Sequence, residues 1–101
     1  MTAAHQYGLQ LHRAGRHQHA VEVLEKVIEA RVRVLGPTDR ATLRSRMRFG
    51  DALAALAVAH TKGRAHREWT AVREAAVREW GEEDELAQMA AKALGAGTRE
   101  P

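Results

Sequence analysis

The fold is decided by residues 33–46, which read RVLGPTDRATLRSR. The leucine-glycine-proline at 35–37 predicts a helix ending, because glycine accepts the left-handed conformation that closes a helix and proline cannot continue the hydrogen-bond ladder. Thr38 or Asp39 can then cap a second helix, whose first large apolar side chain is Leu43. The stretch therefore predicts two helices joined by a sharp turn.

Apolar side chains recur at spacings of three and four through most of the chain, which is the period of an amphipathic helix. The clearest example precedes the turn, over residues 17–35, where charged side chains occupy the opposite face. The same period, interrupted by glycines, predicts four further helices at 3–14, 39–61, 64–80 and 84–94. The sequence thus predicts an all-α fold of about five helices arranged as antiparallel helical hairpins.

The chain contains an internal repeat. Leu35-Gly36 and Trp80-Gly81 end two long helices 45 residues apart, and Leu24 corresponds to Trp69 at the same offset. The turns fit less well: the expected turn glycines, Gly15 and Gly63, are 48 residues apart, so the second turn is predicted to be three residues out of step. The second hairpin is expected to be a diverged copy that lacks the leucine-glycine-proline junction.

With these features the chain resembles a tetratricopeptide repeat, in the kinesin-light-chain-type form common in actinobacterial proteins. The residues that carry the resemblance are Gly8, Leu11, Gly15-Arg16, Ala20, Leu24, the junction at 32–37 and Ala41-Thr42-Leu43. It implies a fragment of an α-solenoid in a single domain, 1–95. The expected parts are repeat one at 3–36, repeat two at 39–81, a capping helix at 84–94 and a flexible tail at 96–101.

The resemblance further implies a scaffold that binds another protein, because partners of this family dock in a groove lined by the first helix of each hairpin. The groove residues it implies are Gln6, Gln10, Arg13, Arg44, Met47, Arg48 and Asp51. Arginines there can clamp an acidic tail or a peptide carboxylate, although the same residues also suit a merely solvated surface. Repeat arrays usually need about three units, so the chain is expected either to associate into a homodimer or to be a piece of a longer repeat array.

Catalysis is not expected. The chain has no cysteine, its only serine, Ser45, sits between arginines in a predicted helix, and no glycine-rich phosphate loop follows a strand. His5, His12 and His19 are seven residues apart, but Gly15 interrupts their alignment, so solvated histidines are favoured over a metal site. No catalytic residue, metal ligand or cofactor is predicted.

The charge pattern offers an alternative function. The net charge is only +3, but Arg40, Arg44 and Arg48 are four apart and form a basic stripe that can contact phosphates. A nucleic-acid-associated regulatory module is therefore the alternative to a protein scaffold, although no base-stacking aromatics accompany the stripe. No membrane span or signal peptide is indicated, and a cytoplasmic location is expected.

Overall fold

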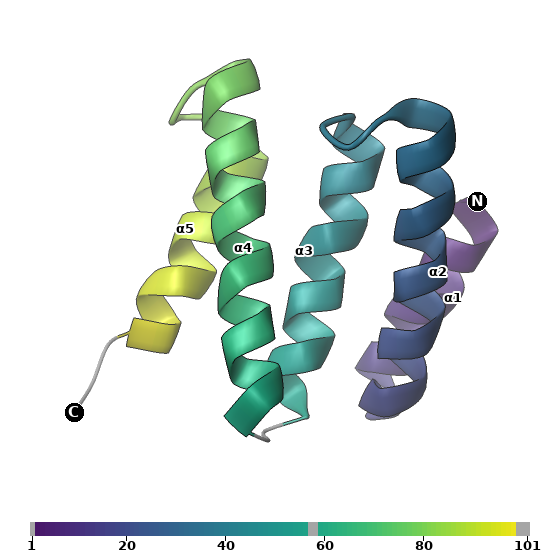
Figure 1. The fold of residues 1–101 in the computed structure, drawn as a ribbon. Coiled ribbons are helices and arrows are strands. Elements are labelled where there is room, and N and C mark those ends of the chain that lie inside the picture. The colour runs from purple at the N-terminus through teal and green to yellow at the C-terminus, as the bar shows by residue number, and fades with distance from the viewer. Residues whose placement is uncertain (1, 57–58, 99–101) are drawn as a thin grey trace.

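The computed structural model describes residues 2–56 and 59–98, with side chains for residues 2–56 and 63–95. This part of the chain contains five helices and no strand, which confirms the predicted all-α fold. The helices are α1 (Thr2–Arg13), α2 (His17–Leu35), α3 (Arg40–Ala55), α4 (Ala59–Trp80) and α5 (Glu85–Thr98). Each packs against the next along the chain, and α2, α3 and α4 stand as a row of alternating direction (Figure 1).

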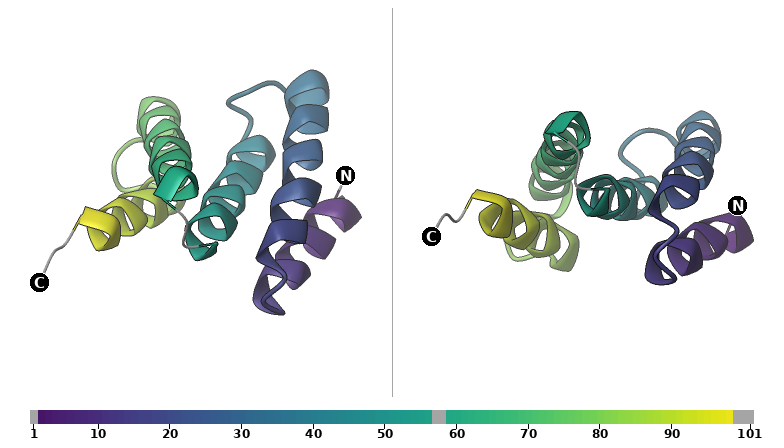
Figure 2. Two further views of the ribbon diagram at one scale, coloured as in Figure 1. Left: turned by 60° about the horizontal axis from the view of Figure 1, so that its bottom comes forward. Right: turned by 90° about the horizontal axis from the view of Figure 1, so that it is seen from below.

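The first and last helices lie on the same side of this row. Figure 2 shows α1 beside α2 and α5 beside α4, with α3 central between the two pairs. One buried cluster joins α1 to α4 and a second joins α3, α4 and α5, with Trp69 packed against both. The side chain of Trp69 therefore links the two halves of the core.

In each hairpin, a glycine in the first helix allows a large side chain of the second helix to pack closely against it. A Cβ added at Gly8 would lie 2.8 Å from the Leu24 side chain, and one added at Gly50 would lie 2.6 Å from Nε1 of Trp69. Leu24 and Trp69 are the pair that the 45-residue offset relates. The same close approach is thus made twice, with a leucine in one hairpin and a tryptophan in the other.

The two junctions are also equivalent, although the sequence predicted that the second was lost. Gly36 and Gly81 both have φ of 98°, a left-handed conformation that favours glycine. Three residues later, Asp39 accepts a hydrogen bond from the Ala41 amide, and Asp84 accepts one from the Leu86 amide. Proline is dispensable here because the glycine reverses the chain and the aspartate caps the next helix.

The turn between α3 and α4 differs from the prediction. A single helix was expected as far as Thr61, but α3 ends at Ala55 and Gly63 lies inside α4. The earlier reversal places Ala65 in the core, where it packs in the cluster that contains Phe49. Since α2 has 19 residues and α4 has 22, and the two helices end 45 residues apart, α4 starts earlier than its counterpart by nearly one helical turn.

The C-terminal helix is longer than predicted. It runs to Thr98, whereas a helix ending at Leu94 and a tail from residue 96 were expected. The glycines at 95 and 97 predict a helix end, but Gly95 has no positive φ and the helix continues through it. Residues 99–101 of the expected tail lie outside the described part of the chain. None of the helices described has the combined length and apolar character that crossing a bilayer requires.

Candidate functional site

A pocket of about 180 Å³ lies between α1, α3 and α5, the odd-numbered helices of the chain. Its lining consists of His5, Arg40, Arg44, Met47, Arg48, Glu85, Leu86 and Met89. In Figure 2, α1 and α5 flank α3 on one side of the molecule, so this pocket follows from the way the helices alternate. It combines an apolar floor with several charged side chains.

The pocket residues of α3 follow the helical period. Arg40, Arg44, Met47 and Arg48 stand at relative positions 0, 4, 7 and 8, and therefore share one face. Met47 is 4% exposed and forms part of the floor with Leu86, whereas Met89 of α5 is only partly buried. Because methionine side chains are flexible and polarisable, such a floor adapts to apolar side chains of different shape.

The arginines of the pocket differ in how they are neutralised. Arg40 donates to Asp84 at 2.8 Å, and Arg48 donates to Asp51 at 3.2 Å. Arg44 is exposed, as is Glu85, and neither forms an ion pair with any side chain that the structure describes. Arg44 is thus the cation of the pocket that is available to a ligand. The carboxylate of Glu85 would repel a negatively charged ligand.

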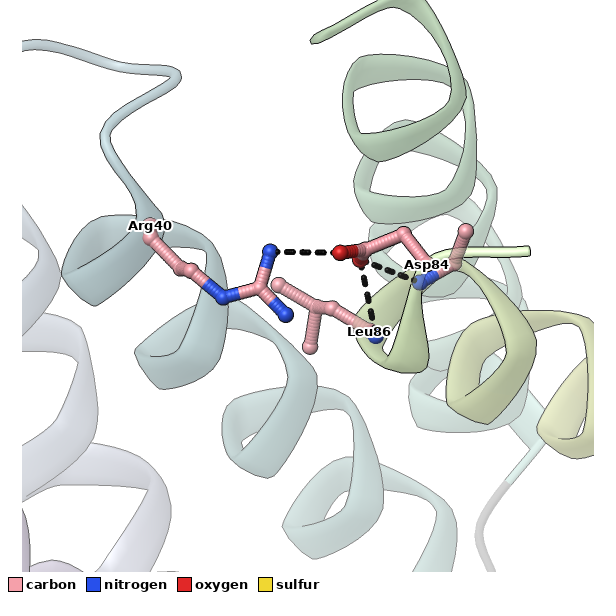
Figure 3. Close-up of polar contacts among 4 residues, drawn as sticks. Arg40, Asp84 and Leu86 are labelled. Carbon is pink, nitrogen blue, oxygen red and sulfur yellow. Dashed lines mark hydrogen bonds and ion pairs between the residues drawn. The ribbon is translucent and has the colours of Figure 1, made fainter. Parts of the chain in front are cut away.

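Asp84 fixes the edge of the pocket on α5. Figure 3 shows its carboxylate between the Arg40 guanidinium and the backbone amide of Leu86 in the first turn of α5. The amide of Ala87 also donates to it. Burial acts to raise the pKa of Asp84, but the hydrogen bonds from Arg40 and the two amides outweigh it and hold that pKa below its usual range. One side chain therefore caps α5 and ties it to α3.

Behind the pocket lies a buried polar chain that joins α2, α3 and α1. Arg31 is only 6% exposed and donates to the carbonyl oxygen of Ala41 at 2.7 Å and to Oγ of Ser45 at 3.0 Å. Ser45 Oγ lies 3.0 Å from Nδ1 of His5, which lines the pocket. Burial, followed by the positive charges of Arg31 and Arg48, lowers the pKa of His5.

A second histidine contact holds the other end of α1. Nδ1 of His12 lies 3.0 Å from Nδ1 of His17 at the start of α2. Burial and the neighbouring His17 lower the pKa of His12. Burial raises the pKa of Asp51 on α3, and the hydrogen bond from Arg48 only partly opposes this shift. The face of α1 that meets α3 is therefore occupied by two partly buried histidines.

The residues predicted from sequence fall into two groups. Arg44, Met47 and Arg48 line the pocket, and Asp51 lies beside it, paired with Arg48. The three residues predicted on α1, which are Gln6, Gln10 and Arg13, are exposed and are not part of the lining.

Sequence reasoning missed the contributions of α5 and of His5. The seven-residue spacing of His5 and His12 was the available signal, since it places both on one helix face. Within the described residues, no three histidine or carboxylate side chains converge as they would around a metal ion.

Fold and pocket together define a class: an all-α protein of consecutive helical hairpins, with a pocket between alternate helices. No family model matches the chain, and neither a curated protein nor a solved structure matches it.

Proposed function

We propose that the chain is a tetratricopeptide-like protein-interaction module of the cytoplasm, without catalysis or a cofactor, and that its partner is an amphipathic acidic segment. The partner docks in the pocket between α1, α3 and α5. The observation that carries the proposal is the pairing of a methionine floor, Met47 and Met89, with the unneutralised Arg44 at the rim. The 45-residue spacing of the two junctions supports the tetratricopeptide-like description.

The chemistry of the partner follows from this lining. Apolar side chains of a docked segment cover the methionines, and a carboxylate pairs with the guanidinium of Arg44, whose planar fork suits two parallel hydrogen bonds. Glu85 lies on the opposite helix of the pocket and disfavours additional negative charge there. An amphipathic segment with its carboxylates over α3 therefore fits better than a uniformly acidic one.

Methionine-methyl NMR tests the proposal directly, because the chain has only three methionines and two of them line the pocket. The probe is a synthetic helical peptide of glutamate, alanine and leucine, and its control is the same peptide with glutamine in place of glutamate. Titration with the acidic peptide should shift the Met47 and Met89 methyl resonances, each assigned by a methionine-to-leucine variant. Binding that leaves both resonances unmoved would contradict this docking site.

Two charge variants should act in opposite directions. Arg44→Glu should weaken the acidic peptide about tenfold, because a hydrogen bond to a charged group contributes about 1.5–3 kcal/mol and 1.4 kcal/mol is a factor of ten. Glu85→Gln should tighten it about threefold, since it removes an exposed like charge. Arg73→Glu on α4 makes the same charge change at an exposed position outside the pocket and serves as the control. Equal weakening by both arginine variants would indicate general charge attraction rather than a site.

Nucleic acid and self-association are the competing outcomes. The contacts of Arg40 and Arg48 with aspartates leave only Arg44 of the predicted basic stripe unpaired, which argues against a phosphate-binding face. A single-stranded oligonucleotide that binds with a steep salt dependence would reverse this ordering. If a homodimer uses the pocket instead, the Met47 and Met89 resonances will change with protein concentration in the absence of peptide. Sedimentation equilibrium without peptide gives the mass that distinguishes such a homodimer from a monomer with a free pocket.

A further inference from the structure

His5 is the pocket residue whose hydrogen bonds lead into the core. Its ring lines the pocket, and Nδ1 lies 3.0 Å from Oγ of Ser45. The same Ser45 oxygen accepts from Arg31, a cation that is 6% exposed and makes no ion pair with a described side chain. The buried guanidinium therefore holds the serine, and the serine in turn holds the imidazole at the pocket wall.

The contacts of Ser45 with Arg31 and His5 determine which atom donates the hydrogen in each hydrogen bond. Arg31 is always a donor, so Ser45 Oγ accepts from it, and the hydroxyl hydrogen is then available to Nδ1 of a neutral His5. The ring hydrogen of neutral His5 consequently sits on Nε2. A proton taken from solvent adds to Nδ1, which then donates to Ser45 Oγ, and the hydroxyl can turn to the Ala41 carbonyl four residues earlier. The contact between Ser45 and His5 thus has a hydrogen-bonded arrangement for each charge state of the imidazole.

The charges around His5 favour its neutral state when the pocket is empty. Arg31 from α2 and both Arg44 and Arg48 from α3 repel a proton there, whereas the acid within the lining is Glu85 of α5. Burial acts in the same direction as the arginines. A ligand carboxylate placed on Arg44 would cancel part of this positive field, and an opposite charge within about 4–6 Å favours the protonated imidazole.

We propose that docking of the acidic segment is coupled to the uptake of a proton at His5, so that the partner binds more tightly as the pH falls below neutral. This coupling rests on the proposed function, since it requires an acidic ligand in this pocket. His5 thereby acts as a proton-linked sensor of occupancy, with Arg31 and Ser45 as the residues that position it.

Isothermal titration calorimetry in two buffers of different ionisation enthalpy, phosphate and Tris, measures the protons taken up on binding. The titrant is the glutamate-alanine-leucine peptide at about pH 7.5, where both buffers have capacity and its carboxylates stay ionised. Wild-type protein should take up a fraction of one proton, and its affinity should rise about tenfold from about pH 8 to about pH 5.5, since each unit of pKa change on binding is a tenfold change in affinity.

The variant His5→Asn keeps a hydrogen-bonding atom near the Nδ1 position and cannot titrate, so its proton uptake should vanish. His66→Asn, on the exposed surface of α4, should leave both affinity and uptake unchanged. His12→Asn should retain the uptake, which separates His5 from the other partly buried histidine. Proton uptake that persists in His5→Asn would overturn the assignment.

A direct measurement covers the case in which His5→Asn does not fold. The Hε1 resonance of His5 in wild-type protein, titrated with and without peptide, should show a pKa that rises on binding. Peptide binding with an unchanged His5 titration would overturn the coupling but leave the docking site intact. No binding at any pH, by either method, would overturn the proposed function itself.

Discussion

Replacement of Gly50 by alanine should destabilise the protein, although alanine is the stronger helix former. The added Cβ would lie 2.6 Å from Nε1 and 2.8 Å from Cδ1 of Trp69. Both atoms belong to a rigid ring that packs against both core clusters, so the ring has little room to move away. Overpacking of this kind costs about 1–3 kcal/mol, and the gain in helix propensity returns about 1 kcal/mol. The expected net loss is up to about 2 kcal/mol.

Gly63 provides a matched control. It is also a glycine inside a helix, but it is exposed, and an added Cβ would meet nothing closer than the Arg67 guanidinium at 3.7 Å. Gly63→Ala should therefore stabilise the protein by about 1 kcal/mol. Urea unfolding of the two variants measures both signs in one chain, and thermal melting should show a shift of about 4–8 °C per kcal/mol for a domain of this size.

Trp69→Phe completes the test, because phenylalanine lacks the pyrrole part of the ring that Gly50 faces. The indole N–H lies near the Asp51 carboxylate and favours its ionised form, but it makes no hydrogen bond of ordinary geometry. Removing this N–H should therefore cost little stability. In the phenylalanine background Gly50→Ala should cost less, a favourable coupling that a double-mutant cycle measures. A Gly50→Ala variant that stabilises as much as Gly63→Ala, or whose cost is the same in both backgrounds, would contradict a steric clash with Trp69.

Three further outcomes follow from the polar contacts. Burial lowers the pKa of both His5 and His12 below 6.5, so these histidines bind protons more readily in the unfolded chain than in the folded protein. The free energy of unfolding should therefore be largest above about pH 6.5 and should fall as the pH drops towards about 5. The double variant His5→Asn/His12→Asn should reduce this fall, as measured by urea midpoints. Asp84→Ala should lose amide-exchange protection at Leu86 and Ala87, and should lower the melting temperature more than Asp39→Ala, because Asp84 also holds Arg40. Arg31→Ala should cost about 2 kcal/mol in urea unfolding, because it strips a charged donor from two buried acceptors; a loss below about 0.5 kcal/mol would show that the buried chain does not support the fold.

The helices that the sequence predicted well are those whose ends depend on local conformation. Gly36 is followed by a capping aspartate, and its φ of 98° is a requirement that a reader of the sequence can recognise. The reversal after α3 has no such marker, because residues 52–59 are mostly alanine and contain neither glycine nor proline. There the end of the helix is set by packing, which brings Ala65 into the core, and a pattern of local propensities does not report that.

The site was only partly predictable for a related reason. Arg44, Met47 and Arg48 could be placed because they share a face of a helix that was predicted. The contact of His5 with Ser45 joins residues 40 apart, and nothing in either local pattern announces the pairing. One signal was present in the sequence: Arg31 stands on the apolar stripe of α2, and a charge in such a position must find buried acceptors.

The residue types that reverse and cap the chain are the same before α3 and before α5, whereas pocket-lining residues at equivalent positions of the two helices differ. The 45-residue offset pairs Gly36 with Gly81 and Asp39 with Asp84, and the residue types that reverse and cap the chain are unchanged. The same offset pairs the groove-facing Arg40 with Glu85, and there the charge is reversed.

A second groove position changes in the same way, since the offset places Met89 on α5 where α3 has Arg44. The pocket therefore changes from basic on α3 to apolar and acidic on α5, which gives a docked segment a preferred direction, with its carboxylates over α3. Moving the glutamates to the opposite end of the probe peptide should reverse the chain direction of the bound peptide, so a nitroxide label at its amino terminus should broaden the Met47 methyl resonance more with one peptide and the Met89 resonance more with the other. Stronger broadening of the same methionine by both peptides would mean that the pocket does not read direction.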